Sequence, residues 1–150
     1  MSLTFTGLSP DAPVASELHL MMTDDSRVAR KVLLVDDDDH VRRLTQRMLE
    51  AAGYEVETVS GGEEALTLAR SLAHVDILIT DVVMPGIMGG AVARAISAMF
   101  PEAHVLLMSG FMEDASVIAN VAAGKWRYLA KPFTGEQLRL ALSAAMNSRL

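Results

Sequence analysis

The sequence contains no cysteine among its 150 residues. Without cysteine, neither a disulfide framework nor a thiolate zinc site can form. The four histidines are too scattered along the chain to suggest a histidine metal cluster. A reducing compartment fits this composition, and we predict a cytoplasmic protein.

Basic residues and long apolar runs are also scarce. The 13 Lys and Arg are outnumbered by 19 Asp and Glu, so the formal net charge is -6 at pH 7. Because binding to a phosphate backbone needs clustered Lys and Arg, we expect no direct nucleic-acid partner. The apolar stretches are far shorter than a membrane span, and the first residues lack the layout of a signal peptide. We therefore predict no membrane insertion.

The composition is otherwise that of one well-cored domain, with 51% hydrophobic residues. Residues 1–29 mix Pro, Ser, Asp and Met without a sustained period, which is typical of a tail or linker. The opening "MSL" has the form of a cloning remnant, and Met21 or Met22 is an alternative native start. We predict that the folded domain comprises residues 30–150.

Strand and helix patterns alternate regularly through this domain. Short apolar runs predict five strands, at residues 31–36, 54–59, 75–81, 104–109 and 126–131. Apolar stripes at helical spacing follow each of them, and Ser60 and Thr134 are candidate helix caps. Five strand-helix units with short links predict an α/β fold, a five-stranded parallel sheet with helices on both faces.

Polar residues stand where four of these strands end. Ligands of an open parallel sheet bind at the carboxyl ends of its strands. The residues found there are Asp36 and Asp37, Asp81, Ser109 and Lys131. Taken singly, each is more simply explained as a cap or turn residue. Their joint occurrence at four strand ends favours a functional site.

Three carboxylates in one cleft need a counter-charge. A hard divalent cation with oxygen ligands supplies it, and Mg²⁺ is the natural candidate, with Mn²⁺ as a substitute. Magnesium uses one or two carboxylates together with phosphate oxygens, which suits phosphoryl chemistry. The Lys131 amine and the Ser109 hydroxyl are suitable partners for an anionic group.

The run "VDDDDH" divides into two pairs of aspartates. Asp36 and Asp37 end the strand and belong to the acidic cleft, whereas Asp38 and Asp39 open the following helix. A cap and the positive end of the helix dipole stabilise negative charge there by about 0.5 to 2 kcal/mol.

These motifs resemble the receiver domain of two-component response regulators, from about Arg30 to the C-terminus. "VLLVDDDDHVRR" is similar to the acidic-pair segment, and "DILITDVVMPGIMGG" is similar to the phosphoacceptor segment around Asp81. "VLLMSG" matches the conserved Ser/Thr position at Ser109. "YLAKPF" matches the family's lysine, at Lys131, and its aromatic switch position, at Tyr128. The resemblance implies the flavodoxin-like (βα)5 receiver fold.

The resemblance also implies the chemistry. Asp81 would accept a phosphoryl group from a phosphohistidine or a small phosphodonor and form an acyl phosphate. Magnesium would be held by Asp37, Asp81 and the backbone carbonyl of Val83, with Asp36 acting mainly through bound water. The domain would be a signalling module that assists its own phosphorylation and dephosphorylation, not an enzyme.

A switch and its partners follow from the same resemblance. Lys131 would pair with a phosphoryl oxygen, and a cis peptide bond between Lys131 and Pro132 would aim it at the site. Ser109 would move to bind another phosphoryl oxygen. Tyr128 would follow inward and alter the surface of the fourth helix, fifth strand and fifth helix. A histidine kinase or phosphotransfer protein would be the partner, output would pass through protein contacts, and a dimer through this surface is a further expectation.

Three alternatives stay open. "MSGFMED" is similar to receivers attached to hybrid sensor kinases, in which case the parent protein would be a histidine kinase. A pseudo-receiver acting only as a scaffold would keep the fold without the chemistry. A haloacid-dehalogenase-like phosphatase would use Asp36 as nucleophile and Asp38 as the second carboxylate. That family has Thr or Val next, where this chain has Asp39 and His40, and the chain has no room for a cap domain.

Overall fold

The structure is a computed structural model that describes residues 30–110 and 114–147. The predicted tail at 1–29 lies outside the described residues. The strands are β2 (Lys31–Val35), β3 (Glu55–Val59), β4 (Ile77–Asp81), β5 (His104–Ser109) and β6 (Arg127–Ala130). The helices are α2 (Asp39–Ala51), α3 (Gly62–Ala69), α4 (Gly89–Met99), α5 (Ala115–Ala122) and α6 (Gly135–Asn147).

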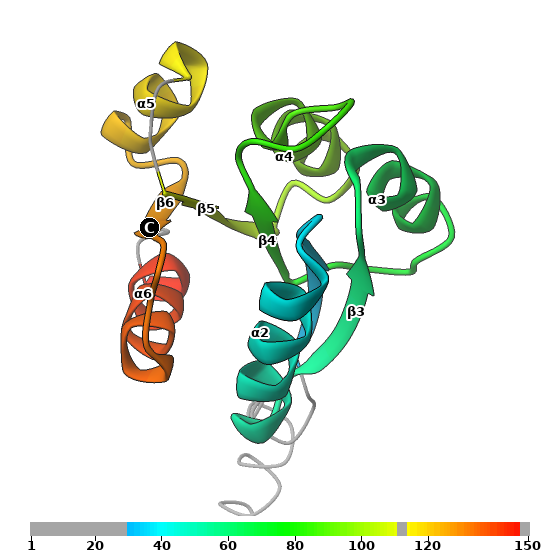
Figure 1. Ribbon diagram of the computed structural model, residues 1–150. Helices are drawn as coiled ribbons and strands as arrows, with labels where there is room; N and C mark the ends of the chain where they lie inside the picture. Colours follow the sequence, from blue (N-terminus) through cyan, green and yellow to red (C-terminus); the bar gives the residue numbers. More distant parts are fainter. Residues whose placement is uncertain (1–29, 111–113, 148–150) are drawn as a thin grey trace, which may run out of the picture.

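The five strands form one parallel sheet in the order β3-β2-β4-β5-β6 (Figure 1). Strand and helix alternate along the chain as the sequence predicted, so the α/β fold with a parallel sheet is confirmed. The strand order reverses beside β2, which pairs with β3 on one side and β4 on the other. The carboxyl ends of β2 and β4 therefore border the position where such sheets bind ligands.

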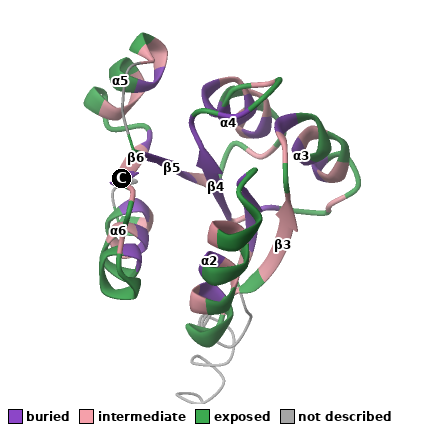
Figure 2. Cartoon of the chain, in the orientation of Figure 1, coloured by how far each residue is buried: buried purple, intermediate pink, exposed green. Residues whose placement is uncertain are grey.

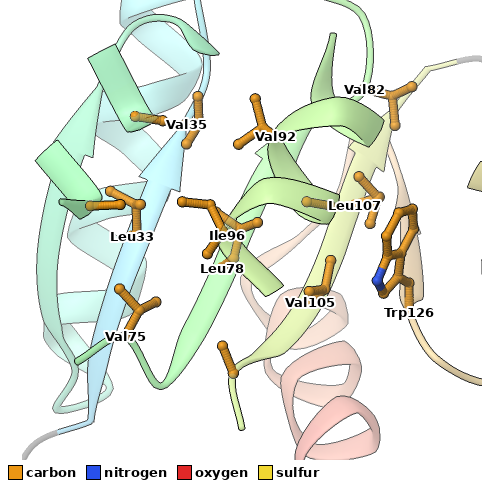
Figure 3. Close-up of a cluster of buried hydrophobic side chains, with 14 of the residues drawn as sticks. Leu33, Val35, Val75, Leu78, Val82, Val92, Ile96, Val105, Leu107 and Trp126 are labelled. Carbon is orange, nitrogen blue, oxygen red and sulfur yellow. The ribbon is translucent and has the colours of Figure 1, made fainter. Parts of the chain in front are cut away.

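Each face of the sheet buries its own hydrophobic cluster. Residues of α3, α4 and α5 pack on one face, and Figure 3 shows part of this cluster with Ile96, Leu107 and Trp126. Residues of α2 and α6, among them Leu49 and Leu138, pack on the other face. Burial on both sides leaves the central strands almost fully enclosed (Figure 2). None of the described helices is long and apolar enough to cross a membrane.

Side-chain caps begin three of the helices. Asp38 accepts hydrogen bonds from the backbone N–H groups of His40 and Val41 at the start of α2. Thr134 Oγ1 accepts from the Gln137 backbone N–H while Gln137 Oε1 accepts from the Thr134 N–H, a capping box. Both caps were predicted.

Asp114 caps α5 in the same way as Asp38, with bonds from Ser116 and Val117. The prediction of Ser60 as a cap is wrong. Gly61 occupies that position of α3 and makes no side-chain hydrogen bond. The Ser60 hydroxyl donates instead to Glu64 Oε1, at 2.9 Å.

Gly89 seats α4 directly behind the end of β4. Its backbone N–H donates to the Val82 carbonyl at 2.8 Å. A Cβ at this position would overlap the carbonyl group of Asp81, so only glycine allows this approach. The helix and the strand end that carries Asp81 are thereby packed backbone to backbone.

We expect Gly89→Ala to destabilise the fold by about 2 kcal/mol or more, because the added methyl group displaces α4 from β4. Gly110→Ala is the matched control, since a Cβ at Gly110 meets no atom within 4 Å. Denaturant unfolding followed by circular dichroism measures both. Equal midpoints for the two variants would contradict the close packing at Gly89.

Candidate functional site

The carboxyl edge of the sheet brings the predicted polar residues together. Asp36 directly follows β2, Asp81 is the last residue of β4, Ser109 is the last of β5, and Lys131 directly follows β6. Parallel pairing of β4 with β5 and of β5 with β6 keeps these strand ends level. The arrangement therefore results from register and requires no special loop.

Three carboxylates form an acidic cluster at this edge. One oxygen from each of Asp36, Asp37 and Asp81 lies within 4.8 Å of the other two. Asp36 is fully buried and Asp81 is 8% exposed, whereas Asp37 is exposed to solvent. The Asp38 backbone N–H donates to Asp36 Oδ1 at 2.9 Å, which fixes that side chain. The cluster thus has two buried members and one at its mouth.

Lys131 joins the two buried carboxylates. Its Nζ donates to Asp36 Oδ2 at 3.0 Å and to Asp81 Oδ2 at 3.1 Å. The peptide bond between Lys131 and Pro132 is cis. One ammonium group therefore serves two carboxylates, and the described cluster keeps an excess of negative charge.

Burial and charge shift the protonation equilibria of this group. Burial raises the pKa of Asp81 above its usual value, and the Lys131 ammonium opposes the rise without cancelling it. Burial also disfavours the charged form of Lys131, but the hydrogen bonds and charges of Asp36 and Asp81 outweigh it and raise the Lys131 pKa. The lysine therefore remains charged over the whole range in which Asp81 titrates.

The Ser109 carbonyl connects the lysine to the aromatic residue. It accepts a hydrogen bond from the Lys131 backbone N–H at 2.9 Å and another from the Tyr128 hydroxyl at 2.8 Å. Ser109 is buried, and Tyr128 is half-buried against the cluster that contains Trp126. The strand end at Ser109 thus contacts the Lys131 backbone and Tyr128, the residue expected to follow its movement.

Arg42 is a site residue that the sequence reasoning missed. Its guanidinium donates to the Asp36 backbone carbonyl at 2.9 Å and to Asp39 Oδ1 at 2.7 Å. The second contact follows the ordinary i, i+3 spacing on a helix and could have been found from the sequence. The first depends on how the turn after β2 folds back. Arg42 therefore anchors the loop that carries the acidic pair.

The donor set fits a hard divalent cation. Such ions bind carboxylate and carbonyl oxygens, and three carboxylates converge here with only one ammonium among them. Val83, the second residue after Asp81, is 58% exposed. The role of its backbone carbonyl as a metal ligand stays a prediction.

Known proteins are similar to this chain in sequence and in fold. A family model described as the response regulator receiver domain matches residues 32–143. Sensor kinase CckA of Brucella abortus is 38% identical over 130 residues, which are 85% of this chain and 14% of that protein. The C4-dicarboxylate transport transcriptional regulatory protein DctD of Rhizobium meliloti is 34% identical over 110 residues, 73% of this chain and 24% of that protein. The chain thus spans only a minor part of these relatives.

Solved structures agree with the sequence relatives. Chemotaxis protein CheY4 of Vibrio cholerae superposes with a TM-score of 0.71 at 32% identity, covering 79% of this chain and 99% of that one. The receiver domain from hybrid histidine kinase CckA superposes with a TM-score of 0.65 at 31% identity, covering 78% of this chain and 99% of that one. In both cases the match covers almost the whole of the neighbour's chain.

We expect Asp81→Asn to stabilise the fold at pH 7 by on the order of 1 kcal/mol, because it removes a buried charge and leaves Lys131 paired with Asp36. The Asp81 pKa is raised in the folded state. The carboxyl group's own contribution to stability is therefore present at low pH and is lost as pH rises through that pKa.

The difference in the free energy of unfolding between wild type and Asp81→Asn should accordingly shrink as pH falls toward 4. Thermal unfolding measured between pH 4 and pH 7 checks this. Asp37→Asn, at an exposed position of the same cluster, is the control and should have the smaller effect. A gap that widened at low pH would contradict the direction of the Asp81 shift.

Proposed function

The chain belongs to the response regulator receiver domain family, the phosphoacceptor domains of two-component signalling, and on this premise we propose that Asp81 accepts a phosphoryl group from a phosphohistidine. The observation that carries the proposal is the contact of Lys131 Nζ with Asp81 Oδ2 at 3.1 Å, inside a cluster of three carboxylates. The lysine is in position to exchange a carboxylate oxygen for a phosphoryl oxygen.

In the proposed transfer, an Asp81 carboxylate oxygen attacks the phosphorus atom. The new O–P bond forms as the P–N bond to the donor histidine breaks, and the histidine leaves with the electron pair of that bond. Asp81 has to be ionised to act as the nucleophile, and Lys131 favours the ionised form against burial. Lys131 then neutralises charge on the phosphoryl oxygens.

The acidic cluster would hold Mg²⁺ through Asp37, Asp81 and the Val83 backbone carbonyl, with Asp36 acting mainly through bound water. Receiver domains generally bind Mg²⁺ at an acidic pocket, and the described cluster has the required oxygen donors. When bound, Mg²⁺ neutralises negative charge on the phosphoryl group. The Asp38 and Arg42 contacts would keep the loop of the acidic pair in place.

The switch would pass through Ser109. Its side chain would move to bind a phosphoryl oxygen, and its carbonyl already carries the Tyr128 hydroxyl. A shift of this strand end would therefore reach Tyr128 and the surface of α5, β6 and α6. Only a few kcal/mol of differential stabilisation are needed to change the populations of two such states.

The parent protein and the partner complete the proposal. Receiver domains interact with histidine kinases or phosphotransfer proteins, and we propose such a protein as the phosphodonor. We place the domain at residues 30–150 and its setting in the cytoplasm. The relatives named as sensor kinase and hybrid kinase support a hybrid kinase as parent. Output through protein contacts and a dimer through α5, β6 and α6 are further parts of the proposal.

The first test is phosphorylation of the purified chain. With magnesium and acetyl phosphate, we expect one acid-labile phosphoryl group, detected by intact mass, and none on Asp81→Asn. Continuous release of phosphate without a labelled protein would indicate a phosphatase instead. Absence of both label and turnover would indicate a scaffold that keeps only the fold.

The second test separates the two pairs of aspartates. Asp37→Ala should abolish magnesium-dependent phosphorylation, because it removes a carboxylate from the cluster. Asp38→Ala should mainly lower stability, by about 1 kcal/mol, because it removes the cap of α2. Phosphoryl incorporation and thermal unfolding are measured on both variants. Equal effects in both assays would refute this division of roles.

A further inference from the structure

A cavity lies at the opposite edge of the sheet from the acidic cluster, at the amino ends of β5 and β6. Its volume is about 270 Å³, close to the lower limit for small-molecule sites. The residues of interest in its lining are Ser97, His104, Lys125, Trp126, Arg127 and Ala145. None of them takes part in the acidic cluster, so this cavity is separate from the proposed phosphorylation site.

Arg127 lines this cavity and carries an unpartnered hydrogen-bond donor. Its Nε is buried, and it is the one buried side-chain nitrogen or oxygen of the described residues that has no hydrogen-bond partner. Burying an N–H group without an acceptor costs on the order of 1 to 3 kcal/mol. Such a group in a native fold is usually explained by a ligand, an ion or a water molecule that completes its contacts.

The charges around the cavity have one sign. Lys125, Arg127 and His104 contribute basic side chains, and no Asp or Glu is among the lining residues. Neither Lys125 nor Arg127 forms an ion pair within the part of the chain that the structure describes. A lining that includes basic side chains and no acidic ones is unexpected in a chain whose net charge is -6.

The backbone holds these groups in place. Gly124 ends α5 with a φ of 80°, and the backbone N–H groups of Lys125 and Trp126 both donate to the Asn120 carbonyl. Arg127 begins β6 in register with Leu106, and Trp126 packs into the core beside Val105 and Leu107 (Figure 3). The basic side chains thus project from a turn that is fixed on both sides.

We propose that this cavity binds a small anion through carboxylate or phosphate oxygens, with Arg127 as the main contact and Lys125 as a second cation. A guanidinium group forms paired hydrogen bonds with either kind of oxygen, and its planar fork fits them better than an ammonium does. The site is independent of phosphorylation at Asp81.

Trp126 makes the proposal measurable, because it is the one tryptophan of the chain and lines the cavity. The full chain, without magnesium or phosphodonor, is titrated with inorganic phosphate and in parallel with succinate, and chloride keeps the ionic strength constant. We expect a saturable change in Trp126 fluorescence, and the tighter of the two anions identifies the ligand class. A change that does not saturate with either anion would overturn the proposal, since water would then satisfy Arg127.

Variants locate the binding. Arg127→Gln should weaken the affinity about tenfold, as expected for loss of a charge-assisted pair of hydrogen bonds. Arg47→Gln, at an exposed arginine of α2, should leave it unchanged. Loss of the response in Lys131→Gln with an unchanged response in Arg127→Gln would place the anion at the acidic cluster and overturn the proposal.

Folding of the variants is checked by circular dichroism and thermal unfolding. If Arg127→Gln does not fold, Lys125→Gln decides, because Lys125 is exposed and its replacement leaves the core intact. A threefold or greater loss of affinity in Lys125→Gln supports the site. An affinity equal to that of wild type overturns it.

Discussion

The ammonium group of Lys131, placed between two buried carboxylates, is the interaction on which the site depends. Without it, Asp36 and Asp81 would be buried like charges, and one of them would have to take up a proton or return to water. With it, both buried carboxylates have a cationic partner, and three carboxylates still share only one ammonium group. The lysine thus keeps a nucleophile available at the edge of an otherwise apolar sheet.

The fold supplies this arrangement through register. Each central strand is mostly apolar and is covered on both faces, so its charged residues stand only at its first or last position or just beyond it. Parallel pairing then lines up the ends of β2, β4, β5 and β6 at one edge. The opposite edge of the same strands carries the basic cavity around Arg127, so the two ends of the sheet differ in charge.

The sequence predicts the features that depend on the spacing of apolar residues and on where each strand ends. The alternation of strands and helices, the caps at Asp38 and Thr134, and the placement of Asp81 all depend on residues close in the chain. Two features were not predicted: Ser60 bonds Glu64 instead of capping α3, and Arg42 contacts the Asp36 carbonyl. In both cases several hydrogen-bond partners lie within reach of the side chain, and only the folded structure determines which one is used. The Arg127 cavity needs α4, β5, β6 and α6 together, and no local pattern encodes that meeting.

The close approach of α4 to β4 at Gly89 makes the packing around Asp81 tight on the side of α4. On this side even one methyl group does not fit between the helix and the Asp81 backbone, so the acceptor residue is backed by a wall that cannot yield. On the other side, the Lys131 backbone N–H donates to the Ser109 carbonyl, and the Lys131 side chain contacts Asp81. We therefore expect a structural response to a change at Asp81 to run toward β5 and β6 rather than toward α4.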